Sequence, residues 1–282
     1  MTVYKHYSQE QLNDQYNIRQ QIPQYAEYFE KWKKQSEQVD KSYAWHKDIF
    51  FGNHSQECLD IFPAKKPLAK TMIFIHGGYW HLLDKALFHF LAPPFLSHNV
   101  NIVFINYLLA PDASMDMIVS SCHRAIQWLH ENVVGYNGNP MEMYLMGHSA
   151  GGHLATMILT AQHTNYLKGV ISISGLFRLE PVMLSFLNRT LLMNVETADK
   201  NSPVLIESLN KCPITLAIGI NETDEFKEQS LEFYNRWSSE RRDMELLFIK
   251  DRNHYSILDE ITEKDSTLLS AIFRMMDNGY RT

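Results

Sequence analysis

The sequence predicts an α/β fold, in which helices cover both faces of a mostly parallel β-sheet. Eight short apolar runs are typical of strands, and amphipathic stretches separate the later ones. Alternating strand and helix signals predict parallel strands that are joined by right-handed crossovers. No repeat or low-complexity tract interrupts the 282 residues, of which 45% are hydrophobic. We therefore expect a single domain over residues 1–282, with enough apolar side chains for a substantial core.

The elements can be assigned in chain order. Residues 1–42 are polar and helix-prone, and we expect them to form a helical N-terminal extension. Apolar residues at helical spacing predict helices over residues 117–130 and 231–237. The first two expected strands are close in sequence, which favours an antiparallel hairpin at the edge of the sheet. The eight expected strands cover residues 45–51, 57–61, 71–75, 100–105, 143–146, 170–173, 214–219 and 245–249.

Residues 175–203 do not fit a simple strand–helix pair. The stretch is rich in leucine, methionine and phenylalanine. One interpretation is a set of helices that pack on the sheet. The other is a cap insertion over the active face, which would supply an apolar wall for the substrate. We expect residues 175–203 to form the cap insertion.

Charge and cysteine content narrow the kinds of partner and compartment. The formal net charge is −6 and no basic block is present, which argues against nucleic acid and acidic membranes as partners. Cys58, Cys122 and Cys212 are too few, and odd in number, for a disulfide framework. The sequence has no apolar signal core and no apolar run of the roughly 18–20 residues that a membrane helix needs. We expect a cytoplasmic protein that acts on a small molecule, and the sequence leaves both a monomer and a homodimer open.

Ser149 lies in the pattern G-x-S-x-G, at residues 147–151. The apolar run 143–146 precedes the pattern, and a helix-like run, 152–159, follows it. A sharp turn between strand and helix holds a serine hydroxyl out of the backbone, and small residues flank it because the turn is crowded. The pattern alone is a weak signal, but this context predicts a nucleophilic serine.

A glycine-rich loop, His76-Gly77-Gly78-Tyr79-Trp80, follows the expected strand 71–75 directly. Such a loop can bring backbone N–H groups close to the negative oxygen of a tetrahedral intermediate, because no Cβ blocks the approach. Hydrolases with this kind of serine turn combine the loop with the N–H of the residue after the serine, here Ala150. We expect an oxyanion hole, with His76 bracing its own loop. A turn that merely closes the strand is the alternative.

The base and its acid should follow the serine, since that is the chain order in these hydrolases. His254 is the last histidine of the sequence and lies in a polar loop after the expected strand 245–249. The acid should follow the expected strand 214–219, where the loop offers Glu222, Asp224 and Glu225. Composition does not choose among these three carboxylates.

Together these motifs resemble the kynurenine formamidases (arylformamidases), a branch of the α/β-hydrolases close to the esterases and lipases. The loop at residues 76–80 is similar to their H-G-G-x-W motif, and residues 147–155 are similar to their serine turn. The resemblance extends over nearly the whole chain. It includes Tyr16-Asn17-Ile18-Arg19, Phe29-Glu30-Lys31-Trp32, Ser174-Gly175-Leu176-Phe177, the stretch from Gly219 to Phe226, and Asn253-His254-Tyr255.

The resemblance also implies roles for individual residues. It implies Ser149 as nucleophile, His254 as base, and the N–H groups of Gly78, Tyr79 and Ala150 as the oxyanion hole. These roles together imply an α/β-hydrolase fold and a serine hydrolase that needs no cofactor.

The acid is the member of the triad for which the resemblance requires a choice. In the animal formamidases it is an aspartate three residues before Glu-Phe, and that position is Glu222 in this sequence. Glutamate for aspartate is a departure from the family, although Ser-His-Glu is an accepted variant of the triad. Asp224 is the alternative acid.

The activity that the resemblance implies is hydrolysis of N-formyl-L-kynurenine to L-kynurenine and formate. One alternative is a general carboxylesterase that acts on short acyl esters through the same residues. The other is a binding protein with a hydrolase fold that has lost catalysis. The presence of Ser149, His254 and Gly78 argues against this last alternative.

Further residues are assigned from their neighbours in the sequence. Trp80 and Phe177 are the expected walls of the substrate pocket. Trp80, with Tyr79, would suit a flat aryl ring, although both could instead be core aromatics, and Phe177 lies in the expected cap. Arg178 is a candidate for binding the substrate's carboxylate, with a surface arginine as the alternative. The histidines beside Ser149 lack acidic or cysteine partners at metal spacing, so we expect no metal site. Five others are expected at the surface: His81, His89, His98, His123 and His130.

Overall fold

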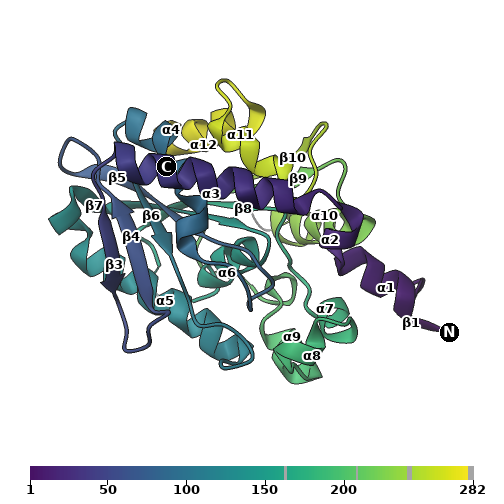
Figure 1. Ribbon diagram of the computed structural model, residues 1–282. Helices are drawn as coiled ribbons and strands as arrows, with labels where there is room; N and C mark the ends of the chain where they lie inside the picture. The colour runs from purple at the N-terminus through teal and green to yellow at the C-terminus, as the bar shows by residue number, and fades with distance from the viewer. Residues whose placement is uncertain (162–163, 208, 240–242, 279–282) are drawn as a thin grey trace.

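The computed structural model describes residues 1–161, 164–207, 209–239 and 243–278. Its centre is an eight-stranded sheet in the order β10-β9-β8-β7-β5-β6-β4-β3 (Figure 1). Each strand overlaps one of the eight that the sequence predicts, so that prediction is confirmed. The strands are β3 (His46–Phe50), β4 (Cys58–Phe62), β5 (Ala69–Ile75), β6 (Asn101–Ile105), β7 (Gly138–His148), β8 (Leu167–Ile173), β9 (Ile214–Gly219) and β10 (Met244–Ile249).

Most of the sheet is parallel. Strands β5 to β10 run parallel to one another, whereas β4 pairs antiparallel with both β6 and β3. The expected edge hairpin of the first two predicted strands is therefore confirmed. Every residue of β6 and β9 is buried, as a parallel sheet with helices on both faces requires.

Helices cover the two faces of the sheet (Figure 1). On one side lie α3 (Tyr25–Ser42), α4 (Ala92–Ser97), α11 (Asp259–Thr262) and α12 (Thr267–Asn278), and on the other lie α5 (Met115–Asn132) and α6 (Ala150–Ile158). The predicted helix 117–130 is α5, and the predicted helix 231–237 is the second half of α10 (Asp224–Ser238). None of the helices in the described part of the chain has both the length and the apolar character needed to cross a membrane.

The parallel strands bring several loops to one edge of the sheet. Strands that run in the same direction end at the same edge, so the segments after β5, β7, β8, β9 and β10 lie near one another. These segments carry the glycine-rich loop, Ser149, the acidic loop and His254. The fold therefore brings the predicted functional motifs to one place, although they are spread over residues 76–254 of the chain.

The N-terminal 42 residues differ in part from the expected helical extension. The chain begins with a short antiparallel hairpin of β1 (Thr2–Tyr4) and β2 (Tyr7–Ser8). Ser8 then starts α1 (Gln9–Tyr16) through a capping box, in which the Ser8 and Gln11 side chains each bond the other residue's N–H. The short α2 (Ile18–Gln21) and the long α3 follow, so helices make up most of residues 9–42.

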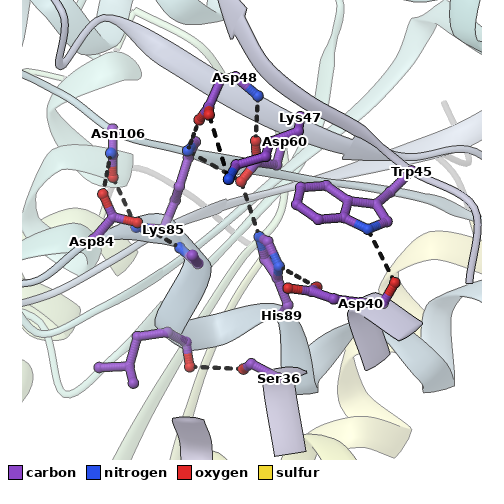
Figure 2. A network of polar contacts seen from close by, with 12 residues as sticks. Ser36, Asp40, Trp45, Lys47, Asp48, Asp60, Asp84, Lys85, His89 and Asn106 are labelled. Atoms are coloured by element: carbon purple, nitrogen blue, oxygen red, sulfur yellow. Dashed lines mark hydrogen bonds and ion pairs between the residues drawn. The ribbon is translucent and has the colours of Figure 1, made fainter. Parts of the chain in front are cut away.

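A buried polar network attaches α3 to the sheet (Figure 2). His89, on the 3-10 helix η1 (Lys85–Leu91), has Nδ1 2.7 Å from Asp40 of α3 and Nε2 3.1 Å from Asp60 of β4. Lys85 Nζ lies 3.1 Å from the same Asp60 carboxylate and 2.7 Å from Asp48. Each buried charge thus faces an opposite charge, which is the condition under which proteins tolerate buried ions.

The network also corrects one expectation. His89 is fully buried, so its predicted place at the surface is wrong. The two carboxylates that hold it are 49 and 29 residues away in the sequence. No local pattern could therefore have revealed them.

Short helices occupy the stretch 175–203. They are α7 (Glu180–Leu184), α8 (Asn188–Leu191) and α9 (Val195–Lys200), and the 3-10 helix η3 (Pro203–Leu205) follows them. Helix α7 contacts α1 and β1. The segment that interrupts the strand–helix alternation therefore adjoins the N-terminal segment. Two further 3-10 helices, η2 (Val133–Tyr136) and η4 (Ser256–Leu258), complete the elements.

Candidate active site

Ser149 lies at a sharp turn between β7 and α6. Its backbone has φ 58° and ψ −121°, a conformation that is unfavourable for a residue with a side chain. The N–H of Ser149 donates a hydrogen bond to the carbonyl of Ile173, on the neighbouring strand β8, at 2.8 Å. The turn is thus fixed to the sheet, and the serine stands at the start of a helix, where the dipole favours negative charge.

Two glycines make this turn sterically possible. An ideal Cβ on Gly147 would lie 2.0 Å from the carbonyl oxygen of Gly151. A Cβ on Gly151 would lie 1.9 Å from the carbonyl oxygen of Ile75. No side chain fits at either position, which explains physically why glycine flanks the serine.

His254 and Glu222 form a buried pair. Nδ1 of His254 lies 2.7 Å from Oε2 of Glu222, and the Glu222 side chain is 0% exposed. Because a carboxylate accepts hydrogen bonds, the Nδ1 proton faces Glu222, and Nε2 of a neutral ring is free to accept a proton. The edge of the ring packs against Phe226, with centroids 4.8 Å apart. This arrangement suits a base whose tautomer and orientation are set by an acid.

Ser174 holds the carboxylate from the other side. Its hydroxyl donates to Oε1 of Glu222 at 2.6 Å, and the N–H of Gly219 donates to the same oxygen at 2.9 Å. Sequence analysis did not single out Ser174 as a site residue. The order of the strands explains its position, because Ser174 follows β8, which lies between β7 and β9 in the sheet. The residue after β8 must therefore lie between the serine turn and the acidic loop.

The other two acids of the loop point elsewhere. Asp224 is in the first turn of α10, where its side chain is 73% exposed and pairs with Lys227 at 2.9 Å. Glu225 is buried and lies 3.6 Å from Lys5. Of the three candidates, the structure brings only Glu222 against His254.

We expect Ser174→Ala to lower kcat/KM by about 10-fold, since it removes one hydrogen bond to a charged group that orients the base. The Gly219 N–H would still hold Glu222, so activity should not be abolished. Steady-state kinetics beside a melting curve measures both effects. An unchanged kcat/KM in a folded variant would show that Gly219 alone is sufficient to position the acid.

His148 is a second histidine beside the pair. Its Nε2 donates to the backbone carbonyl of His254 at 2.8 Å, and the two rings lie 4.8 Å apart. Burial, reinforced by the charge of His254, lowers the pKa of His148 well below its usual value. His148 therefore stays neutral and braces the loop, while His254 is the ring with a carboxylate partner.

In the glycine-rich loop, the carbonyls of Gly77 and Gly78 accept hydrogen bonds from residues in or next to the loop, and this fixes the direction of the next N–H groups. The carbonyl of Gly77 accepts from Nδ1 of His76 at 2.7 Å, and the carbonyl of Gly78 accepts from the N–H groups of His81 and Leu82 at 3.1 and 3.0 Å. In a trans peptide the C=O and N–H point in opposite directions. The N–H groups of Gly78 and Tyr79 therefore point away from His76 Nδ1 and from the N–H groups of His81 and Leu82.

These donors have no partner within the described residues. Neither the N–H of Gly78, nor that of Tyr79, nor that of Ala150 bonds to a described backbone or side-chain acceptor. Gly78, Tyr79 and Ser149 line the same cavity. Free donors at this place suit an oxyanion hole.

A buried layer supports the loop from beneath. The hydroxyl of Tyr107 donates to the carbonyl of His76 at 2.8 Å, and the two rings stack with centroids 4.5 Å apart. Burial lowers the pKa of His76, so its ring is neutral and donates through Nδ1. His76 braces its own loop, in line with the interpretation drawn from the sequence.

Gly78→Ala should reduce kcat/KM by about 100-fold or more and also lower the melting temperature. The residue has φ 105°, and a Cβ there would lie 2.2 Å from the carbonyl oxygen of Leu82. Gly135→Ala is the matched control, because a Cβ at Gly135 meets nothing within 4 Å. A lower melting temperature with normal kinetics would assign the loop a purely structural role.

A cavity of about 190 Å³ opens beside Ser149. Ser149, His254 and His148 lie on its lining, together with Gly78 and Tyr79. The remaining walls are largely aromatic and apolar, which suits a small aromatic ligand. They include Ile18, Phe29, Trp32, Leu82, Leu83, Phe88, Phe186, Leu187 and Tyr255.

Two expected pocket residues lie elsewhere, and these predictions need correction. Trp80 is fully buried, and its indole N–H donates to Nδ1 of His153 at 3.1 Å. Phe177 stacks on Phe233 with centroids 4.2 Å apart, within the core. Neither lines the cavity. Arg178 does not line it either, because its guanidinium pairs with Glu232.

The N-terminal segment supplies walls that sequence analysis did not assign to the pocket. Ile18, Arg19, Phe29 and Trp32 all line the cavity. A hydrogen bond of 2.8 Å from the Tyr79 hydroxyl to the Tyr16 carbonyl joins this segment to the glycine-rich loop. The signal lay in the two N-terminal stretches that resemble the formamidases, which contain these wall residues.

No candidate metal centre is found in the part of the chain that the structure describes. A group of at least three histidine, cysteine, aspartate or glutamate side chains in metal-binding arrangement is absent there. His153, beside the serine turn, bonds to Trp80 and to the Asn201 carbonyl instead.

Comparison with known proteins links the chain to one family. A family model described as BD-FAE matches residues 59–178. A kynurenine formamidase from Danio rerio is 31% identical over 241 residues, which cover 81% of this chain and 81% of that protein. A kynurenine formamidase from Salmo salar is 31% identical over 242 residues, again with 81% of each chain covered.

Solved structures share the fold at lower identity. A structure from Silicibacter sp. is 23% identical, covers 93% of this chain and 98% of its own, and has a TM-score of 0.85. Esterase B from Lactobacillus rhamnosis is 16% identical, with 93% and 96% covered and a TM-score of 0.76. These likenesses establish the α/β-hydrolase fold. Since the fish formamidases match most of the chain at 31% identity, this hydrolase belongs to the kynurenine formamidase family.

Proposed function

We propose that the protein is a serine hydrolase that converts N-formyl-L-kynurenine to L-kynurenine and formate. The observation that carries the proposal is the hydrogen bond of 2.7 Å between His254 and the buried Glu222, together with the cavity that both His254 and Ser149 line. The names of the fish relatives support the substrate, and the aromatic walls of the cavity support an aryl group.

The first half of the proposed reaction forms a formyl-enzyme. Oγ of Ser149 attacks the formyl carbon while Nε2 of His254 takes the hydroxyl proton. The N–H groups of Gly78, Tyr79 and Ala150 donate to the oxyanion of the tetrahedral intermediate. The C–N bond then breaks, His254 returns the proton to the aryl nitrogen, and L-kynurenine leaves.

The second half releases formate. A water molecule attacks the formyl carbon of the ester as His254 takes one of its protons. The bond to Ser149 Oγ breaks, the serine regains its proton from His254, and formate departs. Throughout both halves, Glu222 keeps the imidazole in one tautomer and stabilises its positive charge.

The chemistry of the substrate matches such a site. An aryl amine is a better leaving group than an alkyl amine, and the formyl carbon is unhindered.

Within the proposed single domain, we assign the stretch 175–203 as a cap over the active face, since its residues Phe186 and Leu187 line the cavity. The N-terminal segment, residues 1–42, would close the other side.

A general carboxylesterase is the second candidate. It is favoured by partial matches such as an isoprenylcysteine methylesterase from Arabidopsis thaliana, 29% identical over 47% of this chain, and by esterases among the solved structures. Comparing kcat/KM for N-formyl-L-kynurenine and p-nitrophenyl acetate separates the two. We expect the formamide to be preferred, and a strong preference for the ester would overturn the proposal.

A further test addresses loss of catalysis. A fluorophosphonate probe reacts only with an activated serine, so we expect it to label the wild-type protein at Ser149. Absence of labelling would favour a binding protein with a hydrolase fold.

A further inference from the structure

Among the described residues, the lining of the cavity beside Ser149 contains a positively charged side chain but no negatively charged one. Arg19, on α2, is among its lining residues, whereas no aspartate or glutamate of the described chain is. His148, which precedes Ser149 in the serine turn, also lines the cavity, but burial lowers its pKa and keeps it neutral. A ligand in this cavity therefore meets one permanent cation and no carboxylate on its walls.

Arg19 differs in its partners from four other arginines of the chain. Arg124, Arg178, Arg252 and Arg274 each pair with a glutamate. In the described part of the chain, Arg19 forms no ion pair; its guanidinium lies over the ring of Tyr25, 5.2 Å from the centroid. The guanidinium also forms a hydrogen bond with the side chain of Tyr255. No carboxylate of the described chain pairs with it.

Aromatic side chains hold Arg19 beside the reacting groups. Tyr25 supports the guanidinium face from α3. Tyr255, the residue after His254, is hydrogen-bonded to Arg19. Burial raises the pKa of Tyr255 to about 12, and the charge and hydrogen bond of Arg19 act in the opposite direction. Tyr255 in turn packs on Phe29 and Trp32, other walls of the cavity.

We propose that Arg19 binds the α-carboxylate of the substrate's amino-acid group. This inference rests on the proposed function, because it deepens the recognition of the same substrate. Ser149 would take the formamide end, the aromatic walls the ring, and Arg19 the carboxylate through two parallel hydrogen bonds of the kind that guanidinium forms. Arg19 would then discriminate an amino-acid formamide from a neutral one.

The test compares two formamides with one leaving-group chemistry. N-formyl-L-kynurenine carries the carboxylate, and 2-formamidoacetophenone has the same ortho-acyl formanilide without the amino-acid group. We expect Arg19→Gln to lower kcat/KM for N-formyl-L-kynurenine by about 10- to 100-fold, mainly through KM, because a hydrogen-bonded charge pair is lost. Turnover of 2-formamidoacetophenone should stay within about 2-fold of wild type, since that substrate makes no such pair.

Two further variants sharpen the result. Arg19→Lys keeps the charge but loses the planar fork, so it should recover part of the lost kcat/KM. Arg178→Gln is the matched control, because Arg178 lies outside the cavity and pairs with Glu232. It should affect both formamides equally.

The outcomes separate this inference from the proposed function. If wild type prefers N-formyl-L-kynurenine but Arg19→Gln changes both substrates equally or neither, Arg19 does not bind the carboxylate. If wild type shows no preference for N-formyl-L-kynurenine over the neutral formamide, the carboxylate is not recognised, and the Arg19 proposal falls with it. If wild type hydrolyses neither formamide, the proposed function itself is overturned, together with Arg19's role in it.

Discussion

Replacing Ser149 by alanine is expected to lower kcat by about 10⁴- to 10⁶-fold, because the members of a catalytic triad act as a unit. The remaining activity would come from the oxyanion hole and from substrate binding alone. The fold should survive, since the substitution removes one hydroxyl and leaves the turn's backbone bond to Ile173 intact. Single-turnover kinetics and fluorophosphonate labelling both measure the loss.

Ser172→Ala is the matched control for this result. Ser172 is buried on the neighbouring strand β8, and its hydroxyl has no hydrogen-bond partner among the described residues. Its removal should leave labelling and kcat near the wild-type values. Retention of more than about a tenth of wild-type kcat in Ser149→Ala would contradict the assignment of the nucleophile.

Glu222→Gln is expected to lower kcat by about 10⁴-fold, the loss seen when the orienting acid of another triad enzyme is made an amide. The amide would offer an N–H to Nδ1 of His254 and so favour the wrong tautomer. Ser174 and Gly219 would still contact the side chain, so the loop should fold normally. Kinetics on N-formyl-L-kynurenine, beside a melting curve, separates the chemical effect from a structural one.

Asp224→Asn is the comparison that tests the choice of acid. Asp224 is exposed and pairs with Lys227, so its substitution should leave kcat nearly unchanged. Glu222→Asp should keep partial activity, because it retains the carboxylate on a shorter side chain. The reverse ranking of Glu222→Gln and Asp224→Asn would assign the acid to Asp224.

The sheet could be predicted from the sequence because its strands are short, apolar and separated by clear helical signals. The motifs around Ser149 and His254 are local, and a strand-to-helix turn needs its glycines within two residues of the serine. Local spacing therefore carries the information for both features. The β1–β2 hairpin was missed because its strands contain only three and two residues.

The acid and the pocket walls depend on tertiary structure. Glu222 and Asp224 lie two residues apart, but Asp224 is the first residue of α10 and its side chain is exposed to solvent. Trp80 is the last residue of the glycine-rich loop, yet its backbone has a positive φ of 59° and its side chain is buried against His153. Trp32 reaches the cavity from more than a hundred residues before Ser149. Proximity along the chain is therefore a poor guide to which side chains form a wall.

The buried network around His89 has a consequence for how this enzyme could be altered. The groups proposed to break the bond come from the edge of the sheet, whereas several walls come from residues 18–32. Exchanging the first 42 residues for those of a relative would thus change the range of substrates and leave the reacting groups in place. Such a graft must keep an acid at position 40, since His89 would otherwise be stranded in the interior with one ring nitrogen unbonded.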